Sequence, residues 1–473
     1  MKRSDGLFDL IHSLTPAEKR YFKTTVRGQK AKDQKYFLLF VILDKQLVYD
    51  ENQLRELLKG EPLLKELHVT KNYLFESILK SLRRYHAKSI AHNTVLQLLE
   101  DYNILFQRGL FRLSHLKLHK AKKIAQQFYF HTLQMEIVIC ELRLAIQRRY
   151  SEKNIAYVSS LYSDLRRLLD QSKKNYDLSE LTNTIFAKWM YDGRNRAVGG
   201  ESEFDGILRV VQKEFSHETN DEFTKSIYND LNKNYYYVKG NYKKAFIYAQ
   251  MNFELFRNYA DLRKNSPQHY LTIINDYYMC LLNSSFAQRP DFKQFQTVEK
   301  LLLDIERVPN ADSAIKNNKV LISCCIRLSW CLSMKEYKRG ITFCKTIEKQ
   351  LPKYAEKWGK MQVSIVYLYY ARLYFAVGDF KTSLEWINKI LVDKEMEAFD
   401  EIACTARLFS LILYYELKEF DYLGYAIRNT SNFLNRKKHL YPYEQHILLF
   451  LKRACKVKDG KKQIEQIKHY TKI

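Results

Sequence analysis

Residues 367–391 read YLYYARLYFAVGDFKTSLEWINKIL, which has the form of two helices joined by a tight turn. Apolar side chains recur at helical spacing before and after Gly378, and the Gly-Asp pair that begins there marks the turn. The small residues Ala371 and Ser383 stand where the two helices must approach each other, and the aromatic Phe380 follows the turn. We therefore predict a helical hairpin in this segment.

The same arrangement recurs along the chain. A second copy has its turn at Gly240, its aromatic at Tyr242 and its small residue at Ala245, but Lys233 occupies the position where the first helix is expected to carry a small residue. A hairpin that cannot bury its apolar stripe alone must stack on its neighbours, so the repeats predict an α-solenoid. Weaker copies have their turns at Gly109, Lys335 and Lys418, and their aromatic residues at Phe111, Tyr337 and Phe420.

These copies resemble tetratricopeptide repeats, whose hairpins have small residues at the helix crossing and a Gly-Asp/Asn-Tyr/Phe turn. The resemblance covers about 230–430 and, more weakly, 95–130, and its spacing is longer than the family period of about 34 residues. The whole chain resembles an uncharacterised group of bacterial helical-repeat proteins. Stacked hairpins form an extended groove, so we expect a non-enzymatic scaffold whose concave face binds a protein or peptide.

Composition agrees with a helical chain. Seven Pro and 14 Gly among 473 residues are few, which argues against a turn-rich all-β protein. A hydrophobic content of 46% with 28% charged residues excludes general disorder. The net charge of +25 comes mainly from residues 1–130 and 431–473. This charge favours polyanionic partners over cationic ones, and it also promotes solubility.

The sequence predicts a cytoplasmic chain without membrane association. No export signal is visible near Met1, and the longest uncharged apolar run, 36–43, is far shorter than the roughly 18 residues that cross a bilayer. The eight cysteines fall within apolar helical segments, so we predict buried thiols without disulfides. We expect no cofactor.

We predict an all-α protein with three regions: an N-terminal helical domain over 1–90, tetratricopeptide-like repeats over 91–435, and C-terminal capping helices with a basic tail over 436–473. In the first region, Thr15 and Glu18 have the spacing of a capping box and predict a helix start.

Further helix starts are predicted at Asp50 and, for a helix over 71–88, at Thr70. The outer face of this last helix carries Lys80, Arg83 and Arg84. Residues 50–88 also resemble a helix-turn-helix, and that unit followed by repeats resembles the domain order of peptide-responsive bacterial regulators. The alternative function is therefore a nucleic-acid-binding regulator in which Lys80, Arg83 and Arg84 contact phosphates.

Other clusters of reactive residues are interpreted as structural, and we predict neither catalytic residues nor a metal site. A third alternative is an enzyme whose site assembles only in space. The clusters are a histidine pair (His115, His119), a thiol group assigned to the core (Cys324, Cys325, Cys331, Cys344), an acidic run ahead of a helix (Asp393, Glu395, Glu397, Asp400, Glu401) and a glycine-dense loop (193–206).

Overall fold

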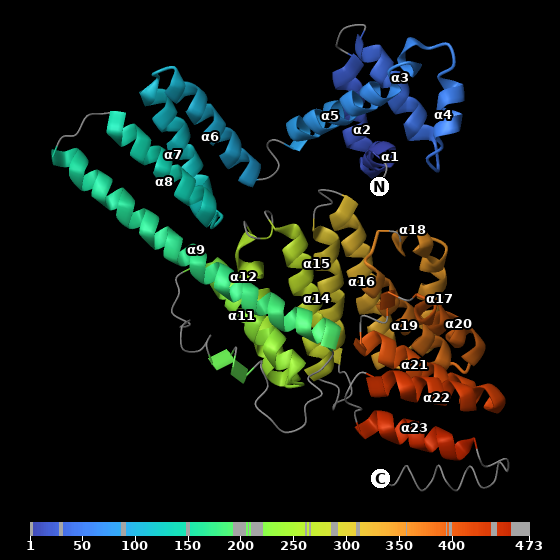
Figure 1. Ribbon diagram of the computed structural model, residues 1–473. Helices are drawn as coiled ribbons and strands as arrows, with labels where there is room; N and C mark the ends of the chain where they lie inside the picture. Colours follow the sequence, from blue (N-terminus) through green and yellow to red (C-terminus); the bar gives the residue numbers. More distant parts are fainter. Residues whose placement is uncertain are drawn as a thin grey trace. The chain divides into compact units, whose positions relative to one another are not determined.

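The regular structure in the described part of the chain is entirely helical (Figure 1), which confirms the predicted all-α class. The glycine-dense loop up to 204 and the basic tail from 456 lie outside the described residues. No described helix has both the length and the apolar character needed to cross a bilayer. The computed structural model describes residues 3–27, 32–86, 91–147, 152–192, 205–206, 208–209, 221–260, 263, 266–284, 292–308, 313–355, 357–393, 395–396, 400–436 and 442–455.

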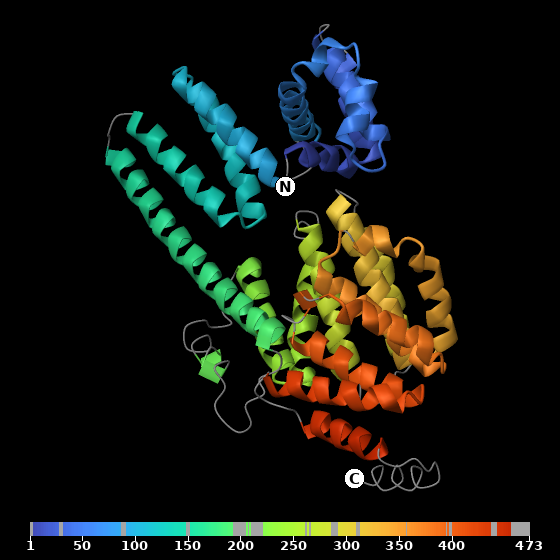
Figure 2. The same ribbon diagram turned by 45° about the vertical axis from the view of Figure 1, so that its right-hand side comes forward.

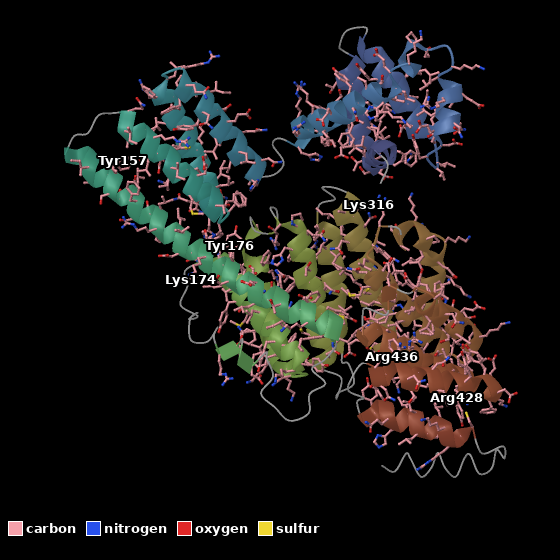
Figure 3. All side chains as sticks on the ribbon, in the orientation of Figure 1. Tyr157, Lys174, Tyr176, Lys316, Arg428 and Arg436 are labelled. Carbon is pink, nitrogen blue, oxygen red and sulfur yellow. The ribbon has the colours of Figure 1, made fainter. Side chains whose placement is uncertain are left out.

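The chain divides into two compact units. Unit 1 comprises residues 1–172 and 310–316, and unit 2 comprises residues 173–309 and 317–473. Helix α9 (Glu152–Asp192) contributes residues to both units, and the exposed Tyr157 and Tyr176 lie on it (Figure 3). The three-region organisation that the sequence suggests stays a prediction.

Unit 1 begins with short helices that share one core. Buried side chains such as Ile11, Phe40 and Ile78 form this core. The helices that contribute to it are α1 (Arg3–Ser13), α2 (Pro16–Arg27), α3 (Lys32–Lys45), α4 (Glu51–Leu57), η1 (Pro62–Leu64) and α5 (Leu67–His86), and they are followed by α6 (Ala91–Gln107), α7 (Phe111–Gln127) and α8 (His131–Gln147).

Two of the predicted helix starts are confirmed and one is wrong. The Thr15 N–H donates to Glu18 Oε2 (2.7 Å) and the Glu18 N–H donates to Thr15 Oγ1 (3.3 Å), which is a complete capping box. Asp50 accepts hydrogen bonds from the N–H groups of two residues in the first turn of α4. Thr70, however, donates both its N–H and its hydroxyl to the Glu66 carbonyl, so it lies inside α5, which begins at Leu67.

Glu18 also binds the last residue of α5. Its side chain is buried, and Oε1 lies 2.6 Å from His86 Nε2. Burial by itself would raise the pKa of the Glu18 carboxyl, but the hydrogen bonds from Thr15 and His86 outweigh it and lower the pKa. Glu18 therefore joins the start of α2 to the end of α5.

We expect Glu18→Ala to lower the free energy of unfolding by about 2 kcal/mol, because both the cap and the His86 contact are lost. Glu18→Gln keeps the cap acceptor and should cost about half as much. Denaturant titration of the full chain measures both, with the exposed Glu56→Gln as control.

The pKa of the Glu18 carboxyl is lower in the folded state than in the unfolded state. The stabilisation from Glu18 is therefore present above the unfolded pKa of about 4.3 and is lost as the pH falls through the folded-state pKa. Equal losses for Glu18→Ala and Glu56→Gln would contradict the assignment.

Unit 2 consists of helical hairpins packed one beside the next in chain order (Figures 1 and 2), an arrangement consistent with a solenoid. The hairpins are α11 (Glu222–Val238) with α12 (Tyr242–Asn258), α14 (Pro267–Ser284) with α15 (Phe292–Arg307), α16 (Ser313–Ser333) with α17 (Tyr337–Glu348), α19 (Lys360–Ala376) with α20 (Phe380–Leu391), and α21 (Asp400–Glu416) with α22 (Phe420–Arg436); α18 (Leu351–Ala355) and α23 (Pro442–Ala454) complete the unit.

The turns of the hairpins share one backbone conformation. The five aligned turn positions have a left-handed φ, between 59° and 83°. Glycine adopts this conformation without steric cost, whereas lysine does not. The turn geometry is therefore common to all five copies even where glycine is missing: Gly109, Gly240, Lys335, Gly378 and Lys418.

The small positions lie at the helix crossings. Ala371 and Ala245 are fully buried, and the Ser383 hydroxyl donates to the Ala371 carbonyl (2.7 Å) across the α19–α20 hairpin. The aromatic positions close the turns, since Phe380 contacts Phe375 and Tyr242 contacts the ring of a tyrosine in α11. These residues hold the hairpins together.

Candidate binding groove

Unit 2 contains a groove of about 560 Å³. Its described walls come from α9 and from α11, α14, α16, α19 and α21, the first helices of the successive hairpins. None of the described lining residues belongs to the second helices α12, α15, α17, α20 or α22. The first helices therefore share one inner face, and the groove runs along that face.

The phase of each helix decides which side chains reach the groove. With 3.6 residues per turn, positions i, i+3, i+4, i+7 and i+8 lie on one side of a helix. In two consecutive first helices, the side chains that line the groove have this spacing and so form a stripe along one side of the helix. The stripes are Asp230, Lys233, Asn234, Tyr237 and Val238 in α11, and Thr272, Asn275, Asp276, Met279 and Cys280 in α14.

A buried ion cluster occupies the part of the groove formed by α11 and α14. Lys233 is 7% exposed; its Nζ binds Asp276 Oδ2 and lies 3.6 Å from Asp230 Oδ1. Asn252 of α12 donates to the same Asp230 oxygen (2.9 Å), which fixes that carboxylate. Burial alone would lower the pKa of Lys233, but the two carboxylates outweigh it and raise the pKa, so the amine stays charged.

Side-chain amides from several helices also line the groove. Within the described residues, none of these amides forms a hydrogen bond to the protein through its side chain. Each amide has two N–H donors and one carbonyl acceptor. The groove therefore offers donors and acceptors to a ligand from Asn183, Asn234, Asn275, Asn318 and Gln362.

The part of the groove formed by α16, α19 and α21 is mainly apolar. Its walls include Leu321, Ile322, Ile365, Tyr369 and Ile402. Apolar walls with a few polar groups are typical of ligand sites, whose volumes run from about 300 to 1,000 Å³.

The two groove cysteines are unreactive thiols. Burial raises the pKa of Cys280 and of Cys325 to about 12. A thiol with such a pKa is almost entirely protonated at neutral pH and is a poor nucleophile. Cys324 is enclosed in the core, and the adjacent Cys325, which turns about 100° away on the helix, packs against the same core and also lines the groove.

The acidic run is also more than a helix start. Asp393 and Glu395 both bind Lys360, at 3.1 and 2.9 Å, and Glu401 lines the groove. Helix α21 does begin at Asp400, as the run suggested. The side chains of Glu397 and Asp400 lie outside the described residues.

The predicted phosphate contacts are on the surface of unit 1. Lys80, Arg83 and Arg84 are exposed on α5, and Arg83 lies 3.9 Å from Glu76. On α7, His115 is half-buried and His119 exposed, and no group of three His, Cys, Asp or Glu side chains in the described part of the chain converges as a metal site would.

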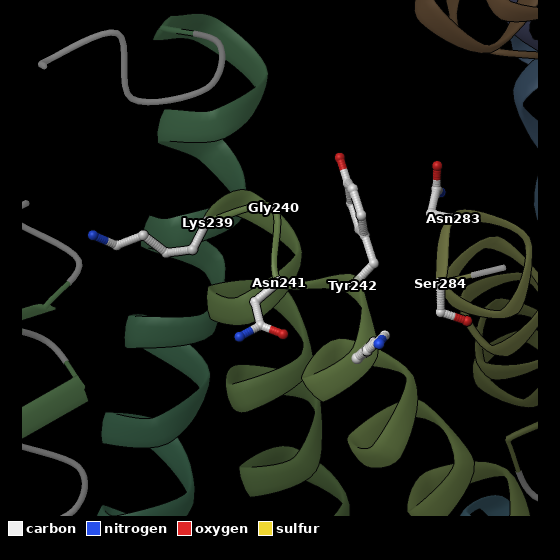
Figure 4. Close-up of a pocket in the computed structure, with 7 residues that line it drawn as sticks. Lys239, Gly240, Asn241, Tyr242, Asn283 and Ser284 are labelled. Atoms are coloured by element: carbon white, nitrogen blue, oxygen red, sulfur yellow. The ribbon is translucent and has the colours of Figure 1, made fainter. Parts of the chain in front are cut away.

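A second, more open hollow of about 720 Å³ lies beside the α11–α12 turn (Figure 4). Gly240, Tyr242 and Asn283 line it, and Lys239 extends away from Tyr242 to pair with Asp205 at 2.9 Å. No cluster of charged side chains converges there among the described lining residues. Of the predicted repeat residues at this turn, Tyr242 contacts the ring of Tyr237 and Ala245 is fully buried, and their packing role stays a prediction.

Sequence reasoning missed most of the groove residues. The one available signal was Lys233, which departs from the small residue expected at its position. Its partner Asp276 belongs to the next hairpin, where the sequence shows no turn motif. Comparison of the chain with models of protein families and with curated proteins finds no match.

Proposed function

We propose that this protein is a non-enzymatic binding scaffold and that the groove of unit 2 binds an extended peptide segment of a partner protein. The observation that carries the proposal is the set of side-chain amides along the shared face of the first helices that have no protein partner in the described part of the chain. An extended peptide has one N–H donor and one carbonyl acceptor at almost every residue, which side-chain amides can pair with. The likeness of the hairpins to tetratricopeptide repeats supports the same function.

The chemistry of the groove favours binding over catalysis. A catalytic lysine or cysteine needs a lowered pKa to act as a nucleophile or base. Lys233 instead has a raised pKa, and burial raises the pKa of both groove thiols to about 12. These groups stay protonated at neutral pH.

The alternative, nucleic-acid binding through α5, rests on the exposure of Lys80, Arg83 and Arg84. Exposed cations are ordinary on the outer face of an amphipathic helix. The groove has the more specific support, because the five side-chain amides that line it have no protein partner among the described residues and meet in a hollow of ligand size.

Selection of random dodecapeptides displayed on phage against the full chain tests the proposal. We expect enriched peptides that lose at least tenfold in affinity when Asn318→Trp fills the groove, because the indole takes the ligand's space. The matched control is Gln250→Trp on α12, an exposed amide on a second helix. Failure to enrich any peptide, or enriched peptides that bind the Asn318→Trp variant normally, would rule out the proposed function.

A further inference from the structure

The charge of the groove is opposite in sign to that of the chain. Among the described residues, its lining contains three carboxylates, Asp230, Asp276 and Glu401, and one cation, Lys233. The chain as a whole has a formal net charge of +25. An acidic hollow in a basic protein concentrates cationic groups at that place and repels anionic ones.

The ion cluster has capacity for one more cation. Lys233 is shared between the carboxylates of Asp230 and Asp276, and His269 Nε2 lies 3.9 Å from Asp230 Oδ2. With His269 counted as neutral, one negative charge of the two carboxylates is left over. Lys233 is the only hydrogen-bond partner of Asp276 among the described residues, and it occupies Oδ2. The Asp276 side chain is 26% exposed, so its carboxylate is accessible to a ligand.

The surroundings of this carboxylate suit a cationic side chain. The amides of Asn234 and Asn275 have no protein partner among the described residues, and their carbonyl oxygens can accept hydrogen bonds from an ammonium or guanidinium group. Charge-assisted hydrogen bonds of this type are roughly twice as strong as neutral ones. The walls formed by α16 and α19 are mainly apolar, with Leu321 and Ile365 among their residues.

We infer that the partner segment bound by the groove carries a basic side chain that pairs with Asp276, together with apolar side chains that pack against α16 and α19. This inference rests on the proposed function and specifies the partner. Charge complementarity selects the occupant, because an acidic segment would meet the excess negative charge of the ion cluster.

Three acetylated hexapeptide pools test the inference. The pools have the same randomised apolar positions and carry Lys, Gln or Glu at the third position. Equilibrium binding to the full chain should be about tenfold tighter for the Lys pool than for the Glu pool, and this preference should weaken as salt screens the charges. A synthetic peptide of residues 456–473, which is rich in lysine, is measured in parallel.

Variants at Asn275 change the groove charge without removing a member of the ion cluster. Asn275→Lys should weaken Lys-pool binding about tenfold, and Asn275→Asp should strengthen it severalfold. Asn388→Lys, at an exposed asparagine on α20 outside the groove, is the matched control and should leave binding unchanged. Thermal melts show whether each variant is folded under the assay conditions.

The outcomes separate the two proposals. Equal binding of the three pools, a preference for Glu, or a loss of binding in Asn275→Asp would overturn the basic-segment inference and leave peptide binding intact. Binding of no pool would overturn both. Tighter binding of the 456–473 peptide than of the Lys pool would assign the groove to the chain's own tail and overturn the inference of a partner.

Discussion

Lys233→Met is expected to lower the free energy of unfolding by about 3 kcal/mol. Removing one member of a buried ion pair costs about 3–5 kcal/mol, because the remaining charge is left without compensation. The side chains of Asp230 and Asp276 are 19% and 26% exposed, so water reaches them in part and the lower end of that range applies. Denaturant titration of the full chain is the measurement, with the exposed Lys243→Met as control.

A second substitution separates the ion cluster from simple packing. In Lys233→Met with Asp276→Leu, one of the two carboxylates that had paired with Lys233 is removed, so stability should recover in part. The pKa of Lys233 is raised, so its contribution is complete below the unfolded pKa of about 10.4 and is lost only as the pH rises through the folded value. A loss no larger than that of Lys243→Met would show that the cluster does not stabilise unit 2.

Ala371→Trp should destabilise unit 2 by about 3 kcal/mol or more. Ala371 is fully buried, and its carbonyl accepts the Ser383 hydroxyl at 2.7 Å, so α19 and α20 are in close contact there. An indole cannot enter without moving α20, and overpacking of this kind costs about 1–3 kcal/mol even for smaller insertions. The lost hydrogen bond leaves a buried polar group unsatisfied and adds to the cost.

The matched control is Val377→Trp, at the exposed residue that follows the last turn of the same helix. Thermal and denaturant unfolding of both variants measure the difference. A melting temperature for Ala371→Trp equal to that of the wild type would refute the close crossing of α19 and α20.

The basic charge of the chain is a poor guide to its groove. From composition we expected polyanionic partners in preference to cationic ones, whereas the groove lining carries more acidic than basic side chains. Net charge averages over the whole surface, and it acts on solubility and long-range attraction. A ligand in the groove meets a few partly desolvated groups, and the local charges act most strongly on it.

Interactions between residues close in the sequence were sufficient to predict the helices and their turns. Helical periodicity, the Thr15–Glu18 capping box and the turn motif at Gly378 involve residues within a few positions of one another, and their geometry follows from backbone sterics and hydrogen bonding. The left-handed turns at Lys335 and Lys418 show that a shared pattern also predicts positions where the favoured residue is missing. The all-α class follows from these local rules.

Which residues line the groove depends on the tertiary structure and could not be predicted from the sequence. Lys233 binds Asp276, which lies on the next hairpin, and the apolar walls come from α16 and α19, still further along the chain. Which stripe of each helix faces the groove depends on how each hairpin is rotated against its neighbour, and a change of one residue turns a side chain by about 100°. Cys324 and Cys325 show the consequence, since Cys324 is enclosed in the core, whereas its neighbour is only partly buried against that core and also lines the groove. Spacing along the chain contains no information on that rotation, because it is set by packing between hairpins.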